Sequence, residues 1–290
     1  MGFFCRCSAL YNYYCTKAFH LRGPSVTVIA KEEVGYMSLS TSAEFNYFKL
    51  GEIDFYYQPQ ISTFTGNIVK LRSAMFLHGY EITRSDALFH FAHNNDSFIT
   101  AVGNLNIQHV CEQLSQWQTQ KQLVIPVSII VRQQQILSGT LLSTVTDSLS
   151  KERLPAKWLE FEFQEDCIYQ RNVTFRNTLH TLHELGITIT LSGFGTDLFA
   201  YRYIRRLPID SVVIHECFVN EIGRCKKAEE LIQKMAITFA ENNIRFCAPK
   251  VQSIKQELFL ASVGCQIIQS AYPPIRAEQV SSLLRDTPNQ

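Results

Sequence analysis

The sequence predicts an α/β fold, a TIM-like (β/α)8 barrel with one antiparallel strand at the start. Three observations predict it. Strand-like and helical runs alternate along the chain, which is typical of parallel βα units. The 290 residues are enough for a barrel of roughly 250 residues. The composition, 46% hydrophobic and 18% charged, supports a large core and argues against global disorder.

The first predicted elements are a short helix and a hairpin. Residues Ala43 to Leu50 have helical character, and Ile53 to Ile61 have the aromatic and β-branched composition of a strand. Thr65, Gly66 and Asn67 give a turn signal, and a second strand is predicted from Ile68 onwards. Two such strands joined by a short turn predict an antiparallel hairpin.

The remaining elements follow in regular order. Ser85 is predicted to cap a helix that contains Leu88, Phe89 and Phe91, and helical spacing of apolar residues predicts another helix over Leu105 to Trp117. The later strand-like runs are Val124 to Val131, Trp158 to Phe163, Ile187 to Leu191, Ser211 to Ile214, Ile244 to Ala248 and Gln266 to Gln269. The helical runs are Ile136 to Leu149, Val173 to Leu185, Leu198 to Arg206, Ala228 to Asn242, Ile254 to Val263 and Ala277 to Leu284. Any ligand site is expected on the loops after the strand C-termini.

Residues 1–41 differ from the rest of the chain. They contain Tyr, Cys and Phe without helical or strand periodicity, followed by Gly23 and Pro24. We expect an irregular N-terminal tail over 1–41, with Met37 as a second candidate start, and a barrel domain over 42–288.

Composition also excludes some classes of function. A net charge of +1 gives no basic face for direct nucleic-acid binding, and no apolar run approaches the roughly 18 residues of a membrane helix. The nine cysteines are odd in number and lack zinc-finger spacing, which favours reduced thiols in a cytoplasmic protein. A metal cluster of Cys5, Cys7 and Cys15 stays open as an alternative. We expect no cofactor.

Short motifs occur in a fixed order along residues 42–285. They are Tyr56-Tyr57-Gln58-Pro59, Thr65-Gly66-Asn67-Ile68-Val69, Phe89-His90-Phe91-Ala92, Pro126-Val127-Ser128, Leu159-Glu160-Phe161-Glu162-Phe163-Gln164-Glu165, Phe194-Gly195-Thr196, Arg206-Leu207-Pro208-Ile209-Asp210 and Gly264-Cys265. In this order they resemble the EAL domain of bacterial cyclic-di-GMP phosphodiesterases. The resemblance implies an EAL-type barrel, and in that family two Mg²⁺ or Mn²⁺ ions promote hydrolysis of a phosphodiester.

The resemblance also identifies positions where the family's metal ligands and catalytic groups are replaced. The replaced positions are Arg72 (for Glu), Phe76 (for the substrate-binding Arg), Ile130 (for Asn), Ser192 and Gly193 (for two Asp), Val213 (for Lys), His215 (for Asp) and Pro249 (for Glu). Gln58, Glu162 and Glu165 remain as vestiges of the site. One aligned ligand carboxylate beside an arginine cannot hold two dications. We therefore expect no bound metal, no catalytic residue and no enzyme activity.

The vestigial residues have other interpretations. Glu162 and Glu165 are remnants of the site, or carboxylates at a strand end, or partners of Arg72. Gln58 either contacts a guanine-like ligand or is an amide that caps a strand. We regard the structural interpretation of each as the simpler one.

A protein partner is the function that these replacements favour. Leu198, Phe199, Tyr201 and Arg202 stand where the family has small polar residues, and apolar groups beside arginine are typical of interfaces. Enterobacterial EAL-like anti-flagellar proteins, which the chain resembles, repress motility by binding a transcription regulator. We expect a regulator of this kind, controlling motility or virulence and biofilm genes. The alternative is a metal-independent cyclic-di-GMP receptor, against which Phe76 argues.

Overall fold

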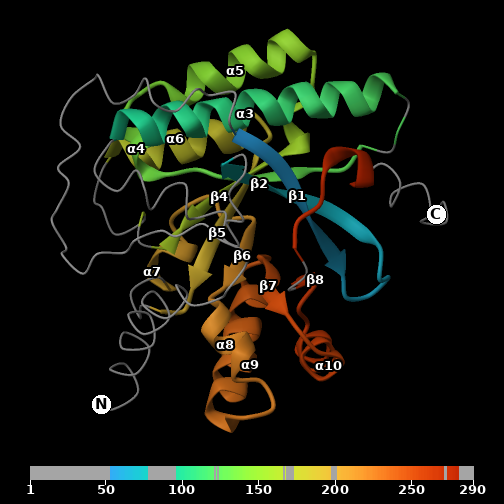
Figure 1. The fold of residues 1–290 in the computed structure, drawn as a ribbon. Helices are drawn as coiled ribbons and strands as arrows, with labels where there is room; N and C mark the ends of the chain where they lie inside the picture. The colour runs from blue at the N-terminus through green and yellow to red at the C-terminus, as the bar shows by residue number, and fades with distance from the viewer. Residues whose placement is uncertain are drawn as a thin grey trace, which may run out of the picture. The chain divides into compact units, whose positions relative to one another are not determined.

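The fold of the chain was taken from a computed structural model, which describes residues 53–77, 96–120, 122, 124–165, 167, 173–196, 201–270 and 273–280 (Figure 1). Eight strands close a barrel in the order β1-β2-β3-β4-β5-β6-β7-β8. Strand β1 is antiparallel to both of its neighbours, β2 and β8, and the pairs from β2–β3 to β7–β8 are parallel. The predicted barrel with one antiparallel strand is therefore confirmed.

The strands lie close to where the sequence predicts them. Their bounds are β1 Ile53–Ser62, β2 Ile68–Leu77, β3 Val127–Ile130, β4 Leu159–Gln164, β5 Thr188–Phe194, β6 Ser211–Ile214, β7 Arg245–Val251 and β8 Ile267–Ser270. The predicted hairpin is confirmed by the β1–β2 pairing, and Gly66 in its turn has a φ of 71°, a value that L-residues rarely adopt.

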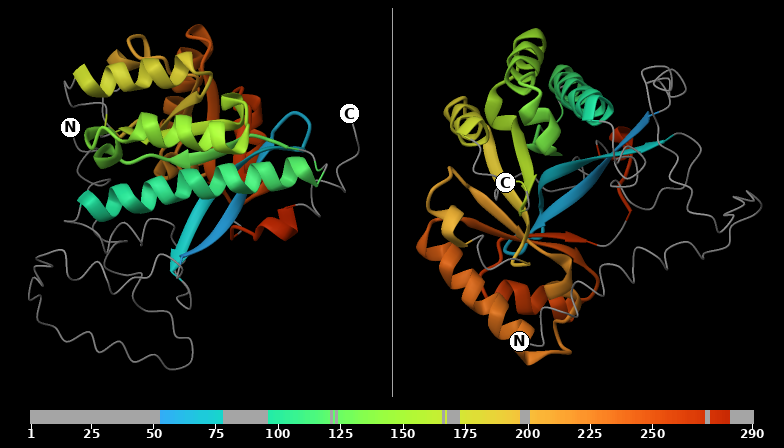
Figure 2. Two further views of the ribbon diagram at one scale, coloured as in Figure 1. Left: turned by 90° about the horizontal axis from the view of Figure 1, so that it is seen from above. Right: turned by 90° about the vertical axis from the view of Figure 1, so that its left-hand side faces the viewer.

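Helices follow most of the strands. Their bounds are α3 Asp96–Thr119, α4 Gln133–Leu137, α5 Leu141–Glu152, α6 Val173–Glu184, α7 Tyr201–Ile204, α8 Glu216–Asn220, α9 Lys226–Glu241 and α10 Ile254–Ser262, with a 3-10 turn at Ala156–Trp158. Figure 2 shows α3, α5 and α6 on one side of the barrel and α9 and α10 on another.

Two predicted boundaries are wrong for identifiable reasons. The strand predicted from Val124 pairs only from Val127, since Pro126 precedes it and has no N–H to donate. The single helix predicted over Ile136 to Leu149 is two helices, α4 and α5, separated at Gly139. This glycine has a φ of 73°, which ends a right-handed helix.

Other helices differ in length from the prediction. Helix α3 begins at Asp96, before the predicted Leu105. Helix α7 is Tyr201–Ile204 and ends before the predicted Arg206, while residues 198–200 of that prediction lie outside the described residues. The short helix α8 was not predicted. The helices expected over Ala43 to Leu50 and after Ser85 fall outside the described residues, and the last one is described only for residues 277–280, which are helical.

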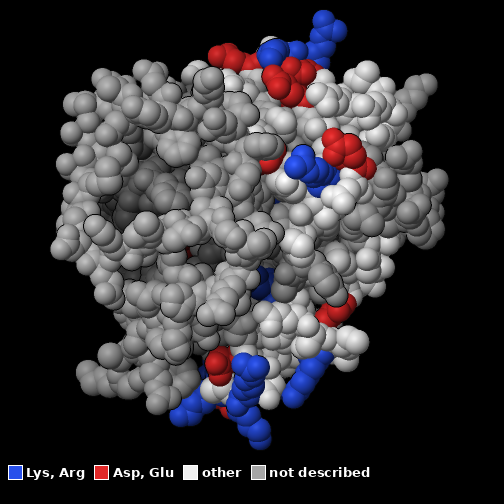
Figure 3. All heavy atoms as spheres, in the orientation of Figure 1, with Lys and Arg blue, Asp and Glu red and all other residues white. Residues whose placement is uncertain are grey.

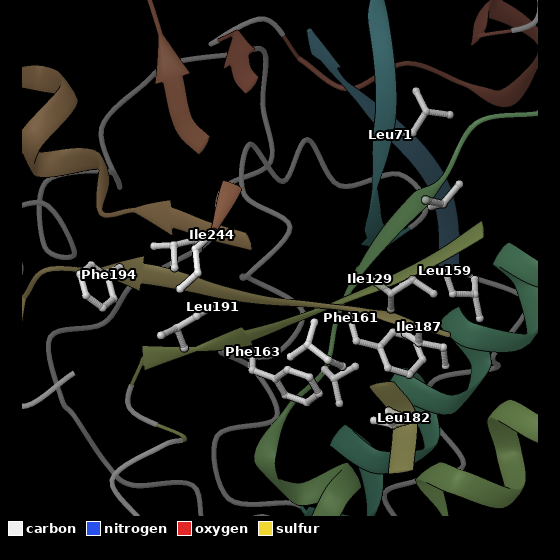
Figure 4. Close-up of a cluster of buried hydrophobic side chains, with 14 of the residues drawn as sticks. Leu71, Ile129, Leu159, Phe161, Phe163, Leu182, Ile187, Leu191, Phe194 and Ile244 are labelled. Carbon is white, nitrogen blue, oxygen red and sulfur yellow. The ribbon is translucent and has the colours of Figure 1, made fainter. Parts of the chain in front are cut away.

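The hydrophobic core lies between the barrel wall and the surrounding helices. Ile129, Phe161 and Leu191 come from three neighbouring strands and are almost completely buried, in contact with the helices through side chains such as Leu182 (Figure 4). Because side chains alternate along a strand, the residues before and after each of these core residues in sequence face the barrel interior. The interior carries polar and charged groups, which form the candidate site.

Candidate functional site

An arginine–carboxylate pair crosses the barrel interior. Arg72 on β2 donates from Nε to Glu162 Oε2 at 3.0 Å and from Nη2 to Glu162 Oε1 at 2.9 Å. Strand β3 lies between β2 and β4, so the pair spans the inside of the barrel, where Ser128 Oγ is 3.4 Å from the same carboxylate. The Glu162 side chain is 4% exposed and that of Arg72 is 24% exposed. Of the alternatives for Glu162, pairing with Arg72 is the one that the structure has.

A second ion pair joins the same two strands two residues earlier. Lys70 Nζ lies 2.6 Å from Glu160 Oε1, and both side chains are buried. Burial alone lowers the pKa of Lys70, but the neighbouring Cys247 and Glu160 more than offset this, so that the pKa is raised above its ordinary value. The lysine therefore stays charged inside the barrel.

Unsatisfied polar atoms lie close to these pairs. Gln58 is opposite Arg72 in the β1–β2 register, and its Nε2 is buried without a hydrogen-bond partner among the described residues. Thr190 Oγ1, on the strand next to Glu162, is also buried and has no hydrogen-bond partner within the described part of the chain. Such atoms are usually satisfied by an internal water. Gln58 thus shares the interior with Arg72 and Glu162.

Glu165 has a different role from Glu162. Its carboxylate accepts hydrogen bonds from the backbone N–H groups of Gly195 and Thr196, at 3.1 and 3.2 Å, and from Thr196 Oγ1 at 2.6 Å. These bonds hold the loop that follows β5. Burial, together with the charge of Glu165, raises the pKa of Tyr201 to about 12, and the tyrosine ring packs edge-on to Phe194.

A third polar group lies at the ends of β6 and β7. His215 precedes α8, and its Nδ1 accepts a hydrogen bond from the Cys217 N–H. Burial lowers the pKa of His215. The charge of Glu216 acts to raise this pKa, and the charge of Lys250 lowers it further. Lys250 forms an ion pair with Glu216 and has a φ of 52°, in the left-handed region that favours glycine.

The other predicted positions are scattered around the strand ends. Ile130 is buried opposite Glu162, Ser192 is buried on β5, and Gly193 faces the His215 ring. Val213 and Pro249 are partly buried on β6 and β7. Leu198 and Phe199 lie outside the described residues, as does the side chain of Arg202, so the predicted partner surface is described only at Tyr201.

The described residues do not fit the pair of dications that the resemblance implies. Within the described ranges, no three His, Cys, Asp or Glu side chains gather as a metal would require. Both carboxylate oxygens of Glu162 accept hydrogen bonds from the Arg72 guanidinium, so a cation already pairs with this carboxylate.

Charges of both signs are interspersed on the face drawn in Figure 3. None of the described helices combines the length and apolar character needed to cross a membrane.

Comparison with known proteins identifies relatives over most of the chain. The model of the EAL domain family matches residues 42–272. The cyclic di-GMP phosphodiesterase PdeR of Escherichia coli is 22% identical over 210 residues, which are 72% of this chain and 32% of that protein. Signaling protein YkoW of Bacillus subtilis is 27% identical over 194 residues, 66% of this chain and 24% of that protein. The chain thus matches about a quarter to a third of these relatives' length.

Solved structures have the same fold. A MucR phosphodiesterase in complex with c-di-GMP aligns with a TM-score of 0.73 at 20% identity, covering 79% of this chain and 94% of that one. The FimX EAL domain from Pseudomonas aeruginosa bound to c-di-GMP aligns with a TM-score of 0.69 at 19% identity, covering 78% and 91%. At this identity the alignments establish the barrel and not the ligand.

One sequence-based expectation needs correction. The expectation that the chain is not an enzyme is contradicted, since the family match and relatives named as phosphodiesterases point toward an enzyme. That expectation relied on single positions in short motifs, which do not outweigh a match over 42–272. Neighbours with this fold were solved with c-di-GMP, so the barrel itself is compatible with that ligand.

Three features of the site were missed in the sequence. Lys70 pairs with Glu160, Lys250 pairs with Glu216, and Arg276 lies over the ring of Tyr56. Lys70 and Glu160 each precede a charged site residue by two positions, which was a usable signal for a shared strand face. Arg276 follows the last strand and carries no such signal.

Proposed function

We propose, on the premise that this chain belongs to the EAL domain family, that it acts in cyclic-di-GMP signalling by binding the dinucleotide at the mouth of its barrel. The observation that carries the proposal is the Arg72 guanidinium, which Glu162 holds in one plane while 24% of its side chain stays exposed. A guanidinium recognises phosphate through paired N–H donors, and a fixed one loses less entropy on binding.

The location of the site also supports binding. Arg72 is the last residue of β2 that pairs with β3, Glu162 lies in the second half of β4, and His215 directly follows β6, so the site opens toward the end of a parallel barrel where ligands bind. Because Arg72 supplies a positive charge without a metal, we expect the phosphate contact to form in the absence of Mg²⁺ and Mn²⁺. The family relation also points toward hydrolysis of the dinucleotide, which is measured separately from binding.

Calorimetry tests this proposal. Purified full chain is titrated with cyclic di-GMP in EDTA and again in Mn²⁺, and the same samples are assayed for hydrolysis. We expect binding in both buffers, and a loss of affinity of at least tenfold, about 1.4 kcal/mol, in Arg72→Lys, which keeps the charge but loses the bidentate geometry.

The matched control is Arg176→Met, which removes an exposed arginine from α6, and we expect unchanged affinity. The absence of heat at high micromolar dinucleotide in EDTA and in Mn²⁺ would rule the proposal out.

A protein-binding regulator is the second candidate function. Ile254 and Leu258 lie one turn apart on α10 with 75% and 66% of their surfaces exposed, and apolar groups exposed together are typical of interaction sites. The partner suggested by the resemblance is a flagellar or other transcription regulator of motility or virulence and biofilm genes. The six described cysteines are free thiols, which supports action in the reducing cytoplasm.

A pull-down compares the two surfaces proposed for such a partner. We expect wild-type chain to recover a transcription regulator in stoichiometric amount, and Ile254→Ser/Leu258→Ser to lose it. Tyr201→Ala tests the predicted surface at Leu198, Phe199, Tyr201 and Arg202 in the same experiment. Recovery of no stoichiometric partner by the wild type would count against this candidate.

A further inference from the structure

The exposed apolar side chains of α10 belong to a helix whose position is fixed (Figure 1). Gln256 attaches α10 to α8, because its buried Nε2 donates a hydrogen bond to Val219 O at 2.9 Å. Gln256 and Leu260 are buried on the side of α10 that faces the barrel, so Ile254 and Leu258 point away from it. The exposure of this aliphatic pair is therefore a property of the folded chain.

The loop between α8 and α9 passes beside the first turn of α10 and carries positive charges. The Lys255 side chain lies across Gly223, so closely that a Cβ at this glycine would come within 2.7 Å of Lys255 Nζ. Arg224 is exposed in the loop, and Lys226 and Lys227 are exposed at the start of α9. Four cations are thus grouped next to the aliphatic pair.

This loop is more basic than the chain as a whole. The net charge of the entire chain is only +1, whereas residues 220–227 contain three cations and one acid, Glu221. The next acids are Glu229, whose carboxylate accepts a hydrogen bond from the Gly223 N–H at 2.7 Å, and the exposed Glu230. Within the described ranges none of the four cations forms an ion pair, so their charges are available to a partner.

The stability of the fold does not account for this arrangement. Lys226 and Lys227 stand in the first turn of α9, where a positive charge opposes the helix dipole, and the N-cap Cys225 gives no side-chain hydrogen bond. Ile254 and Leu258 leave 75% and 66% of their surfaces in contact with water. Two features that each oppose stability lie side by side, which is typical of a binding surface.

The charges around the aliphatic pair differ from one side to the other. On α10, Lys255 borders the pair on the side of the loop, and Glu257 borders it on the other side. A membrane of uniform negative charge would be repelled by Glu257 and Glu221, whereas a protein helix can present a charge of the right sign at each position. The nine residues of α10 extend over about 14 Å, which two to three turns of a partner helix would cover.

We infer that this surface binds an amphipathic helix of a partner protein, in which Asp or Glu residues flank one side of an apolar stripe. The α10 surface is defined by two aliphatic residues and four cations: Ile254, Leu258, Lys255, Arg224, Lys226 and Lys227. The stripe packs on the aliphatic pair, and the acidic flank faces the loop. The inference rests on the second candidate under the proposed function, a protein-binding regulator, and names the chemistry of the segment that the regulator would present.

Fluorescence anisotropy with a labelled probe peptide tests the inference. The probe is a helical peptide of about 18 residues, five turns, with Leu at every third or fourth position and Glu along one flank, and its counterpart has Lys in place of Glu. We expect the full chain to bind the Glu peptide about tenfold more tightly than the Lys peptide, and Lys226→Glu/Lys227→Glu to reverse this preference. Ile254→Ser/Leu258→Ser should weaken the Glu peptide by about tenfold.

The matched control is Lys234→Glu/Ile237→Ser, which makes the same two kinds of substitution at exposed positions of α9. These positions lie at least about 10 Å beyond Lys227 along the helix, so the affinity for both peptides should stay unchanged. All the substituted side chains are exposed, and thermal unfolding followed by circular dichroism verifies that each variant is folded.

Equal affinity for the two peptides, or an unchanged preference in Lys226→Glu/Lys227→Glu, overturns the α10 surface. If the wild type still recovers a transcription regulator in the pull-down, the proposed function stands without it. Peptide discrimination as expected, without recovery of a regulator, supports the surface and removes the second candidate function. Binding to phosphatidylglycerol vesicles that Lys226→Glu/Lys227→Glu abolishes, with neither peptide bound, assigns the surface to lipid and overturns the inference.

Discussion

Two ion pairs connect β2 to β4 inside the barrel, and they differ in their access to solvent. Lys70–Glu160 is buried on both sides, whereas Arg72–Glu162, two residues farther along, keeps a partly exposed guanidinium. The deeper pair has no route to a ligand and can only hold the strands together. The upper pair combines a fixed geometry with an accessible cation. The buried ion pair thus stabilises the barrel, and the partly exposed ion pair is available for ligand recognition.

The largest effect is expected from breaking the deeper pair. Lys70→Met leaves Glu160 as an uncompensated buried charge, which costs about 3–5 kcal/mol of unfolding free energy. Urea denaturation followed by circular dichroism measures it. The matched control is Lys70→Met/Glu160→Leu, which replaces both charges by apolar groups and should recover most of the loss. A single variant as stable as the wild type would contradict a structural role for the pair.

Breaking the upper pair should cost less. Arg72→Met leaves Glu162 with its contact to Ser128 and with the mouth of the barrel open beside it, so we expect a loss of about 1–3 kcal/mol. The same denaturation experiment gives the value. If Arg72→Met proved more destabilising than Lys70→Met, the Arg72–Glu162 pair would be the main structural pair, contrary to the role assigned to it here.

A smaller effect is expected from pH at the β6–β7 side of the mouth. The folded-state pKa of His215 lies below its ordinary value of 6.5, because the ring is buried and Lys250 is close, with Glu216 opposing. Its contribution to stability is therefore present above pH 6.5 and is lost as the pH falls through the lowered folded value.

Unfolding free energies measured between pH 7.5 and pH 5 test this sign. The wild type should lose more stability over this range than His215→Gln, in which His109, whose pKa is also lowered by burial, is retained as an internal reference. Equal losses in the two proteins would remove His215 as a titrating group of the fold.

The smallest effect is expected at Lys250. Lys250→Gly relieves a left-handed residue, worth roughly 1–2 kcal/mol, and removes a partly exposed ion pair with Glu216, worth about 0–1 kcal/mol. Glycine also loses more backbone entropy on folding, roughly 0.5–1 kcal/mol, so we expect a net change of no more than about 1 kcal/mol in favour of the variant. Thermal unfolding measures it, and a clear loss of stability would show that the ion pair matters more than the strain.

Most of the barrel could be predicted from the sequence because each strand is a short apolar run between helical segments. The β6 prediction, Ser211 to Ile214, has the observed bounds. Prediction failed where one residue decides the backbone, as at Gly139, whose left-handed φ divides α4 from α5. Helix α8 was missed because five residues are too few for a helical period to be recognised.

The site was less predictable than the fold. Pairing of Glu162 with Arg72 was one of the alternatives that the sequence offered, but its place inside the barrel depends on the order β2-β3-β4, which no local pattern encodes. Lys250 has a φ of 52°, which is typical of a glycine position, and its residue type gives no signal of this conformation. Judging activity from replaced ligand positions was wrong, because the family relation extends over 42–272 and points the other way.

The reversed direction of β1 determines where the polypeptide enters the barrel. In an all-parallel barrel the first strand starts at the floor, whereas here Ile53 starts at the rim and Ser62 ends below. A signal that travels down the upstream chain would therefore reach Asp54 and Tyr56 within a few residues, without crossing the core. A domain fused upstream would therefore change the conformation of the rim before that of the core, and the rim is where a change would alter ligand affinity.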